Sequence, residues 1–384
     1  MADAPAPAGP GKRAELAQLT GLRGIAAAWV VLYHFQPQIF ALAPELRPLA
    51  VVLRGGYFAV DLFFLLSGYI IAYQYLHAFP RGRGDYGAFL VKRIARIYPL
   101  QLVTLVLIVI LVVGGVALGV PVTPPSAFTA WGAVQDALLI RGWVVPSQGW
   151  NFPAWSLSAE WFAYLVFPAV ALLLGVVRRR LALLAAVAVV CVGVEAAGTV
   201  LLPGFDGMPH PLLRVMVAFL LGACLYAAPR PPIPPAAAGW VAAVAGVALV
   251  AGCELLPGDP LRAAVSLLLA AVIVLGLAHG GGPVTRFLGS RVPEYAGRIS
   301  YGVYMIHGIV LMVATIALGA LALIVPLPEV LAWPLIARIG IVLVPLAVSG
   351  VAGAALYHLV ERPAQRWITG PLRRRAVPAA EVDR

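Results

Sequence analysis

The chain has 384 residues, of which 62% are hydrophobic and only 11% charged, whereas soluble domains carry roughly 25% charged residues. A soluble fold of this size cannot hide so much apolar surface, because part of it must face water. The composition excludes a soluble enzyme, a disordered chain and a disulfide scaffold, and it predicts a polytopic membrane protein. The net charge of +11 belongs to no soluble basic domain, so no nucleic-acid partner is expected.

Ten apolar runs follow one another along the chain, each near the ~20 residues that a helix needs to cross a bilayer. Each is expected to be helical, since a lone strand leaves its backbone polar groups unpaired in lipid. The sequence therefore predicts an all-α bundle of about ten transmembrane helices, with nine as the alternative because runs six to eight are rich in Ala and Gly. The runs are Leu22–Ala41, Tyr57–Leu76, Ile94–Gly119, Ala154–Val177, Leu181–Leu202, Pro211–Ala228, Ala237–Leu256, Leu261–His279, Ile299–Val325 and Leu331–Val360.

Most Lys and Arg residues lie at the two chain ends and in every second connection. This asymmetry predicts that both termini are cytoplasmic. Residues 1–18 are expected to be a flexible cytoplasmic N-terminus, residues 19–367 the transmembrane domain and residues 368–384 a basic cytoplasmic tail. The first run also has features of a cleavable signal peptide, but its length and its histidine favour a retained helix. The three cysteines show no metal or redox spacing, and no metal is expected.

Six predicted helices carry an ionisable side chain at membrane depth, where a charge costs on the order of 3 kcal/mol or more. A hydrogen bond between helices explains any one of them alone. Several together indicate a polar cavity inside the bundle. The six residues are His34, Asp61, Glu160, Glu195, His307 and Arg338, of which Glu195 and Arg338 have no predicted role.

Basic residues begin the first and third predicted helices. Arg23 and His34 are eleven residues apart, which places them on one helix face about 16 Å from each other. An anion bound by Arg23 at the cytoplasmic surface can then extend a reactive end to His34 near the midplane. Lys92, Arg93 and Arg96 share neighbouring positions on the third helix. They are expected either to anchor anionic lipid headgroups or to hold a phosphate.

The fourth predicted helix carries a polar stripe. Ser156, Glu160 and Tyr164 are spaced i, i+4, i+8 and share one face, with Trp155 and Trp161 nearby. The tryptophans are explained either by an interfacial belt or by a lining on which a sugar ring stacks. A carboxylate inside such a belt favours the second interpretation, a site for a hydroxyl-bearing acceptor.

Two further helices contribute polar groups. Ser300, Tyr304 and His307 share one face of the ninth predicted helix and are expected on the cytoplasmic side of the cavity, with an internal hydrogen-bonded stripe as the alternative. Asp61 lies near the outer end of the second helix. It can pair with His34, raising the basicity of the imidazole and fixing its tautomer.

Six segments, which occur in this order over nearly the whole chain, together resemble the acyltransferase 3 family of integral membrane acyltransferases. They are "LTGLRGIAAAWVVLYHF", "GYFAVDLFFLLSGYII", "FLVKRIARIYPL", "NFPAWSLSAEWFAYLVFP", "GRISYGVYMIHGIVL" and "YHLVERPAQRW". The family's Arg and His of the first helix correspond to Arg23 and His34, and its basic motif of the third helix corresponds to Arg93 and Arg96. Each segment alone is a weak signal, whereas all six in order are specific.

The resemblance implies a multi-pass enzyme of the bacterial inner membrane that transfers an acyl group, often acetyl, from cytoplasmic acyl-coenzyme A to a hydroxyl of a carbohydrate, glycolipid or glycosylated metabolite. The expected partners are membrane lipid, the acyl-coenzyme A co-substrate and this acceptor. His34 is expected to act as general base or acyl acceptor, with Asp61 or Glu160 orienting the imidazole or the acceptor. The expected donor-binding residues are Arg23, Lys92, Arg93, Arg96, Ser300, Tyr304 and His307, and the expected acceptor-binding residues are Trp155, Ser156 and Trp161.

Two other classes of protein remain as alternatives. A proton-coupled transporter or flippase also needs buried ionisable residues, but the sequence has no pair of interrupted helices at matching places in two halves. A non-catalytic scaffold has no need of cations aligned beneath a histidine at the midplane. Release of free thiol from acyl-coenzyme A distinguishes the enzyme from both.

Overall fold

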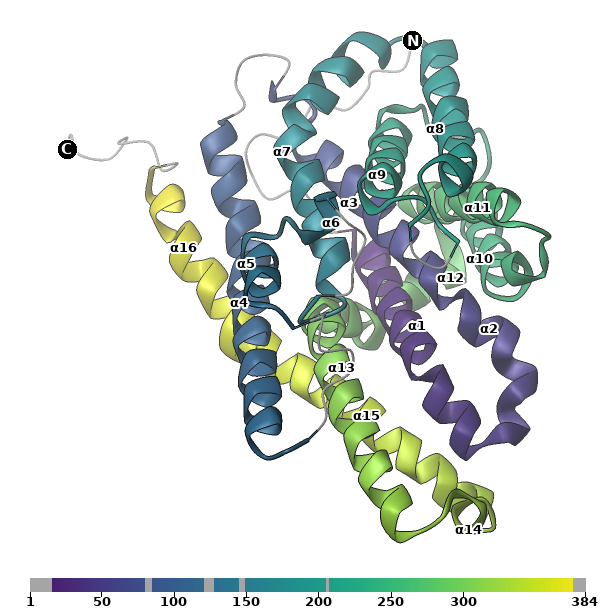
Figure 1. Ribbon diagram of the computed structural model, residues 1–384. Coiled ribbons are helices and arrows are strands. Elements are labelled where there is room, and N and C mark those ends of the chain that lie inside the picture. The colour runs from purple at the N-terminus through teal and green to yellow at the C-terminus, as the bar shows by residue number, and fades with distance from the viewer. Residues whose placement is uncertain (1–15, 80–84, 121–127, 145–148, 205–206, 376–384) are drawn as a thin grey trace.

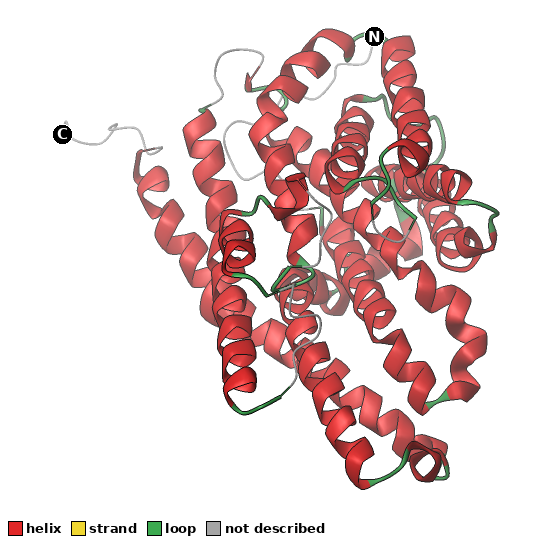
Figure 2. Cartoon of the chain, in the orientation of Figure 1, coloured by secondary structure: helices red, strands yellow, loops and turns green. Residues whose placement is uncertain are grey.

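The computed structural model describes residues 16–79, 85–120, 128–144, 149–204 and 207–375. Within these ranges every regular element is a helix (Figures 1 and 2). The longer helices pack side by side, while the ends of α13 and α15 extend from one end of the bundle (Figure 1). The prediction of an all-α bundle is confirmed.

In the described ranges, nine helical stretches are long and apolar enough to cross a membrane. The sixth predicted run, Pro211–Ala228, forms a shorter helix, α9 (Pro211–Ala227), of 17 residues. Pro211 is the first residue of this helix, and its ring prevents the helix from extending toward the N-terminus. A Pro-rich connection follows the helix and prevents it from extending toward the C-terminus. The multi-pass prediction is confirmed, and the number of long helices agrees with the nine-helix alternative. The long stretches are Ala17–Leu42, Pro44–Tyr75, Tyr86–Ala117, Ala154–Val177, Leu181–Leu201, Pro235–Leu255, Asp259–His279, Arg291–Ile324 and Leu335–Leu372.

Five helices surround the site described below, and the others support them. The five are α1 (Ala17–Leu42), α3 (Ala59–Tyr75), α4 (Tyr86–Ala117), α7 (Ala154–Val177) and α13 (Arg291–Ile324). The supporting helices are α8 (Leu181–Leu201), α9, α10 (Pro235–Gly252), α11 (Asp259–His279), α15 (Leu335–Leu356) and α16 (Arg362–Arg375). Short elements connect them: η1 (Pro44–Leu49), α2 (Ala50–Arg54), η2 (Gly55–Phe58), α5 (Ala130–Leu138), α6 (Arg141–Val144), η5 (Cys253–Leu255), α12 (Gly282–Leu288) and α14 (Leu327–Leu331).

Glycines bring two of the site helices, α1 and α3, into backbone contact with a neighbouring helix. A Cβ atom at Gly297 of α13 would overlap the carbonyl group of Thr20 in α1, and one at Gly68 of α3 would overlap a carbonyl group of α9. Small residues permit such close approach between membrane helices. The contacts fix the rotation of α1 and α3, and with it the direction of their polar side chains, Arg23 and Ser67.

The last long helix consists of α15 and α16, joined without a break by a π-helical turn at Tyr357–Glu361. A π-turn widens the helix locally and occurs often at functional sites. The turn directs Glu361 inward against α4, where its side chain is fully buried and forms an ion pair with Arg96.

The connection before α7 covers one side of the bundle. Its described part folds as α5 and α6, which pack on α4 and α7: Gln101 donates to the backbone of α5, and the Trp143 indole donates to the Ser158 carbonyl oxygen at 2.8 Å. Asp136 accepts from Arg141 at 2.6 Å and from the Trp150 amide at 2.8 Å. Burial raises the pKa of Asp136, although Arg141 opposes the shift. The segment is therefore tied to the bundle by buried polar contacts.

Candidate active site

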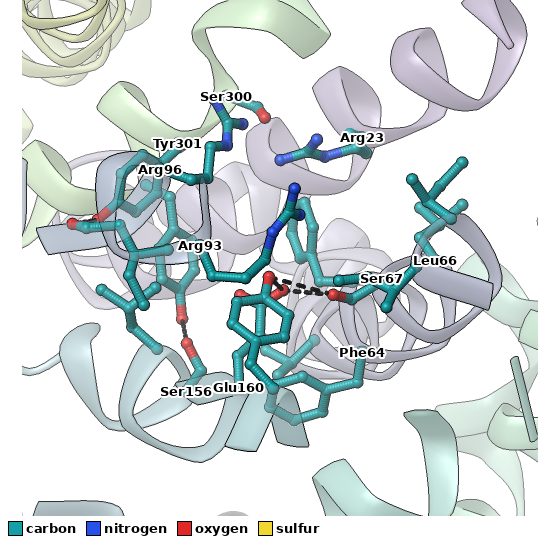
Figure 3. Close-up of a pocket in the computed structure, with 18 residues that line it drawn as sticks. Arg23, Phe64, Leu66, Ser67, Arg93, Arg96, Ser156, Glu160, Ser300 and Tyr301 are labelled. Atoms are coloured by element: carbon teal, nitrogen blue, oxygen red, sulfur yellow. Dashed lines mark hydrogen bonds between the residues drawn. The ribbon is translucent and has the colours of Figure 1, made fainter. Parts of the chain in front are cut away.

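A pocket of about 140 Å³ lies between α1, α3, α4, α7 and α13. Figure 3 shows polar side chains from these helices converging on it. Segments that are far apart in the sequence therefore meet at one site, as the predicted polar cavity requires. The sequence-predicted residues that line it are Arg23, Arg93, Arg96, Ser156, Glu160, Tyr164, Ser300 and Tyr304.

One end of the pocket is strongly basic. The guanidinium groups of Arg23, Arg93 and Arg96 face the same region (Figure 3). Arg96 is already neutralised in part, because it forms an ion pair with Glu361 and lies 5.6 Å above the ring of Tyr301. The three arginines together can bind an anion, with Arg96 the most constrained of them.

Arg93 differs from Arg96 in its surroundings. Its guanidinium carbon lies 5.8 Å from the rings of Phe89 and Tyr164 and 6.0 Å from the ring of Tyr75. Among the described residues no carboxylate forms an ion pair with it, and its buried Nε has no hydrogen-bond partner there. Aromatic faces stabilise a cation without neutralising its charge. Arg93 is therefore well placed to contact an incoming anion.

The middle of the pocket holds a carboxylate network. Glu160 Oε1 accepts from Ser67 Oγ at 2.6 Å and from Tyr164 Oη at 2.5 Å (Figure 3). Ser156 Oγ and Tyr304 Oη are 2.7 Å apart. The predicted stripe of Ser156, Glu160 and Tyr164 thus forms one wall, and its hydroxyl groups can interact with a bound carbonyl or hydroxyl group.

A pair of histidines lies beyond the pocket wall. His34 is not among the residues that line the pocket, and His307 lies beside it, with His307 Nε2 at 3.2 Å from His34 Nδ1. Tyr304 lies between the pocket and the histidine pair, since it lines the pocket and the centroid of its ring lies 5.6 Å from that of His307. His307 was predicted to bind the donor on the cytoplasmic side; the structure instead places it against His34.

The hydrogen bonds of this pair define the tautomers. His307 Nδ1 is 2.6 Å from the Tyr304 carbonyl oxygen, and His34 Nδ1 is 2.9 Å from the Val30 carbonyl oxygen. A carbonyl oxygen only accepts, so both Nδ1 atoms carry hydrogen. The single hydrogen on His34 Nδ1 is then shared between the Val30 carbonyl oxygen and His307 Nε2, and the lone pair of His34 is on Nε2. This is the form that a base or nucleophile requires.

Asp61 does not take the predicted position beside His34. Its two carboxylate oxygens accept from Arg214 of α9, Oδ1 at 2.6 Å and Oδ2 at 3.2 Å. Both side chains are almost fully buried, and Arg214 also donates to the Tyr57 carbonyl oxygen. The expectation that Asp61 fixes the tautomer of His34 is therefore corrected: His307 and a backbone carbonyl group do so.

Three other predicted residues do not line the pocket. Lys92 is exposed and lies 5.9 Å from the ring of Tyr75. Trp155 packs near Phe64 and beneath Arg214, and Trp161 packs against Tyr98. Successive residues of a helix are rotated by about 100°. The neighbours of the pocket-facing Ser156 and Glu160 therefore point away from the pocket into the core.

Several residues of the site had no role predicted from the sequence. They include Ser67, Tyr301 and Glu361, and also Arg214, the partner of Asp61. Ser67-Gly68 interrupts an apolar run, and Glu361 is a carboxylate in the last of the six quoted segments. These two signals were available in the sequence, whereas the partners of the residues depend on how the helices pack.

Comparison with known proteins shows which family the chain belongs to. The family profile of acyltransferase domains matches residues 16–352. The chain belongs to the acyltransferase 3 family. It is 30% identical to "Acyltransferase MdmB" of Streptomyces mycarofaciens, over 97% of this chain and 96% of that protein. It is also 29% identical to "Putative membrane-bound transacylase BcsY" of Komagataeibacter xylinus, over 59% of this chain and 55% of that protein. No solved structure matches the chain.

Proposed function

We propose that this member of the acyltransferase 3 family is an O-acyltransferase that uses acyl-coenzyme A, with acetyl as the acyl group. The observation that carries the proposal is the meeting of Arg23, Arg93 and Arg96 at one end of a pocket whose wall contacts the His34–His307 pair. The acceptor is a hydroxyl of a carbohydrate, glycolipid or glycosylated metabolite, a class that rests on the family resemblance. The bacterial relatives favour a bacterial cell membrane as its location.

The pocket suits one part of this donor. Coenzyme A carries several phosphate charges, and arginine is the side chain that best matches phosphate geometry. At about 140 Å³, the pocket is smaller than the ~300 Å³ or more of a typical site for a drug-sized ligand. The pantetheine arm and its thioester therefore enter it, the diphosphate lies at the arginine end, and the adenosine remains outside.

His34 Nε2 is the proposed base. It removes the proton of the acceptor hydroxyl while the oxygen attacks the thioester carbonyl carbon, the new C–O bond replaces the C–S bond, and the proton passes to the departing thiolate. A two-step route through an acyl-His34 group has the same balance. Ser156 donates its hydroxyl hydrogen to the Pro153 carbonyl oxygen, so Tyr304 is the donor in their contact. Rotation of Tyr304 opens the pocket toward the imidazole and frees its hydroxyl to donate to the oxygen on which negative charge develops.

Thiol release tests the proposal directly. Purified protein is incubated with acetyl-coenzyme A and a bacterial lipid and glycan extract, and free thiol is measured against time. Wild-type protein is expected to release thiol, and His34→Ala to lower the rate by about 10²–10⁴-fold, the usual contribution of a general base. His358→Ala is the matched control, because His358 is exposed and lies outside the pocket.

Two results would overturn parts of this proposal. If wild-type protein releases no thiol, acyl-coenzyme A is not its donor. If His34→Ala elutes as folded protein and keeps the wild-type rate, His34 has no part in the chemistry.

A further inference from the structure

A second pocket, with a volume of about 420 Å³, lies where α3, α7 and α9 end. We call it the helix-end pocket. It is distinct from the candidate active site, with which it shares no lining residue. Its lining residues are Leu76, His77, Arg178, Arg179, Tyr226 and Ala227.

Arg178 has an unusual environment for a partly buried cation. Its Nη1 is 2.7 Å from His77 Nδ1, so the guanidinium donates to a neutral imidazole. Its Nε is buried and has no hydrogen-bond partner among the described residues, where no carboxylate forms an ion pair with it either. A desolvated cation without a negative partner is costly. An anion in this pocket would remove that cost.

Aromatic side chains adjoin the same pocket. The hydroxyl oxygen of Tyr226 lies 3.4 Å from His77 Nε2. Its ring is also in edge contact with Tyr69 and Tyr73, each at 5.8 Å between ring centroids. An anionic ligand that also carries a flat ring would therefore find both a cation and aromatic surface here. The pocket volume falls in the range of ~300–1,000 Å³ that is usual for small-ligand sites.

The two pockets are close along α3. Ile71 lines the candidate active site, and Leu76, the residue that follows α3, lines the helix-end pocket. The helical rise over these five residues is about 8 Å. The diphosphate and pantetheine of coenzyme A are longer than this distance. One donor molecule can therefore reach the helix-end pocket while its thioester lies in the active site.

We propose that the helix-end pocket binds the 3′-phosphorylated adenosine of the acyl-coenzyme A donor, with Arg178 on the 3′-phosphate and Tyr226 beside the adenine. The inference rests on the proposed function, because it needs acyl-coenzyme A as donor. It adds a second phosphate site, separate from Arg23, Arg93 and Arg96. It also explains how a small active-site pocket serves a large donor.

The test compares donors as well as variants. Wild-type protein is assayed with acetyl-coenzyme A and with 3′-dephospho-acetyl-coenzyme A, and binding of adenosine 3′,5′-bisphosphate is measured separately by calorimetry. The wild-type KM is expected to be about tenfold higher for the dephosphorylated donor, which equals about 1.4 kcal/mol. Arg178→Gln is expected to raise the KM for acetyl-coenzyme A by the same factor, to leave that of the dephosphorylated donor unchanged and to abolish adenosine bisphosphate binding.

Control variants separate this site from general charge effects. Arg180→Gln removes the same charge two residues away, at an exposed position outside the pocket, and is expected to behave as wild type. Arg178→Lys keeps the charge but loses the fork of donors, so an intermediate KM is expected. Because the wild-type donor comparison needs no variant, the test stands even if Arg178→Gln does not fold.

Each other outcome overturns the inference in a recognisable way. Equal wild-type KM values for the two donors, with thiol released from both, refute it and leave the proposed function intact. If neither donor releases thiol, both the proposed function and this inference are refuted. If Arg178→Gln changes only the dependence of activity on phosphatidylglycerol in phosphatidylcholine vesicles, the pocket binds a lipid phosphate instead.

Discussion

The buried and half-buried arginines of this bundle differ in what surrounds their guanidinium groups. Arg214 is held by both carboxylate oxygens of Asp61, and the pair is almost fully buried. Arg93 and Arg178 pack against aromatic or imidazole rings, and each keeps a buried Nε without a partner among the described residues. A buried guanidinium paired with a carboxylate has its charge compensated within the fold, and removing one partner destabilises the protein. One that lacks such a partner is placed to bind the anion of a ligand.

The largest effect is expected from breaking the structural pair. Asp61→Asn leaves the charge of Arg214 buried without a negative partner. Removing one member of a buried ion pair typically costs about 3–5 kcal/mol of stability. The thermal unfolding temperature in detergent should fall sharply, and folded yield with it. The double variant Asp61→Leu, Arg214→Met should recover much of the loss, because no charge remains buried. An Asp61→Asn protein as stable as wild type would contradict the structural role.

Substitutions in the histidine pair are expected to lower kcat rather than stability. His307→Ala removes one of the two acceptors of the His34 Nδ1 hydrogen, so kcat is expected to fall about tenfold, as for the loss of one orienting hydrogen bond. The KM for acetyl-coenzyme A should not change. His307→Gln, whose amide oxygen also accepts, should restore part of kcat. A fall in kcat that is equal for both variants would argue against this positioning role.

A KM effect without loss of stability is expected at the basic end of the pocket. Arg93→Gln removes one charged contact to phosphate, which is worth about 1.5–3 kcal/mol, so the KM for acetyl-coenzyme A should rise at least tenfold while kcat and the unfolding temperature change little. Lys92→Gln is the matched control, since Lys92 is the adjacent cation but is exposed outside the pocket. If the KM for acetyl-coenzyme A is the same in both variants, Arg93 does not bind the donor and acts as a lipid anchor.

The smallest effect is expected from the tryptophans of α7. Trp161→Phe keeps an aromatic ring against Tyr98 and does not alter the pocket lining. The KM values for donor and acceptor should therefore remain those of wild type. A raised KM for the acceptor alone, measured at saturating acetyl-coenzyme A, would show that Trp161 contacts the acceptor after all.

Local spacing predicted much of this molecule. Apolar runs predicted the helices because a bilayer demands a minimum length, and the i, i+4, i+8 spacing predicted that Ser156, Glu160 and Tyr164 share a wall. Helical periodicity fixes both properties within a single segment. The same argument placed Ser300 and Tyr304 in the pocket.

Partners across the bundle were not predictable in this way. Asp61 and Arg214 are 153 residues apart, and which helix faces α3 depends on packing at Gly68. Glu361 reaches Arg96 because a π-turn redirects it, and no pattern in the sequence marked that turn. The apolar runs define the helices, whereas close contacts and local irregularities define which polar groups meet.

The proposed enzyme binds the phosphates of its donor at the arginine end of the pocket and brings the thioester to the histidine pair. A density map of the purified protein with a non-hydrolysable acetyl-coenzyme A analogue would show both contacts at once. We expect phosphate density at Arg23 and Arg93, with the acyl end beside His34 and the ring of Tyr304 turned aside. Analogue density that lies away from these arginines, or an acyl end that stops short of His34, would contradict it.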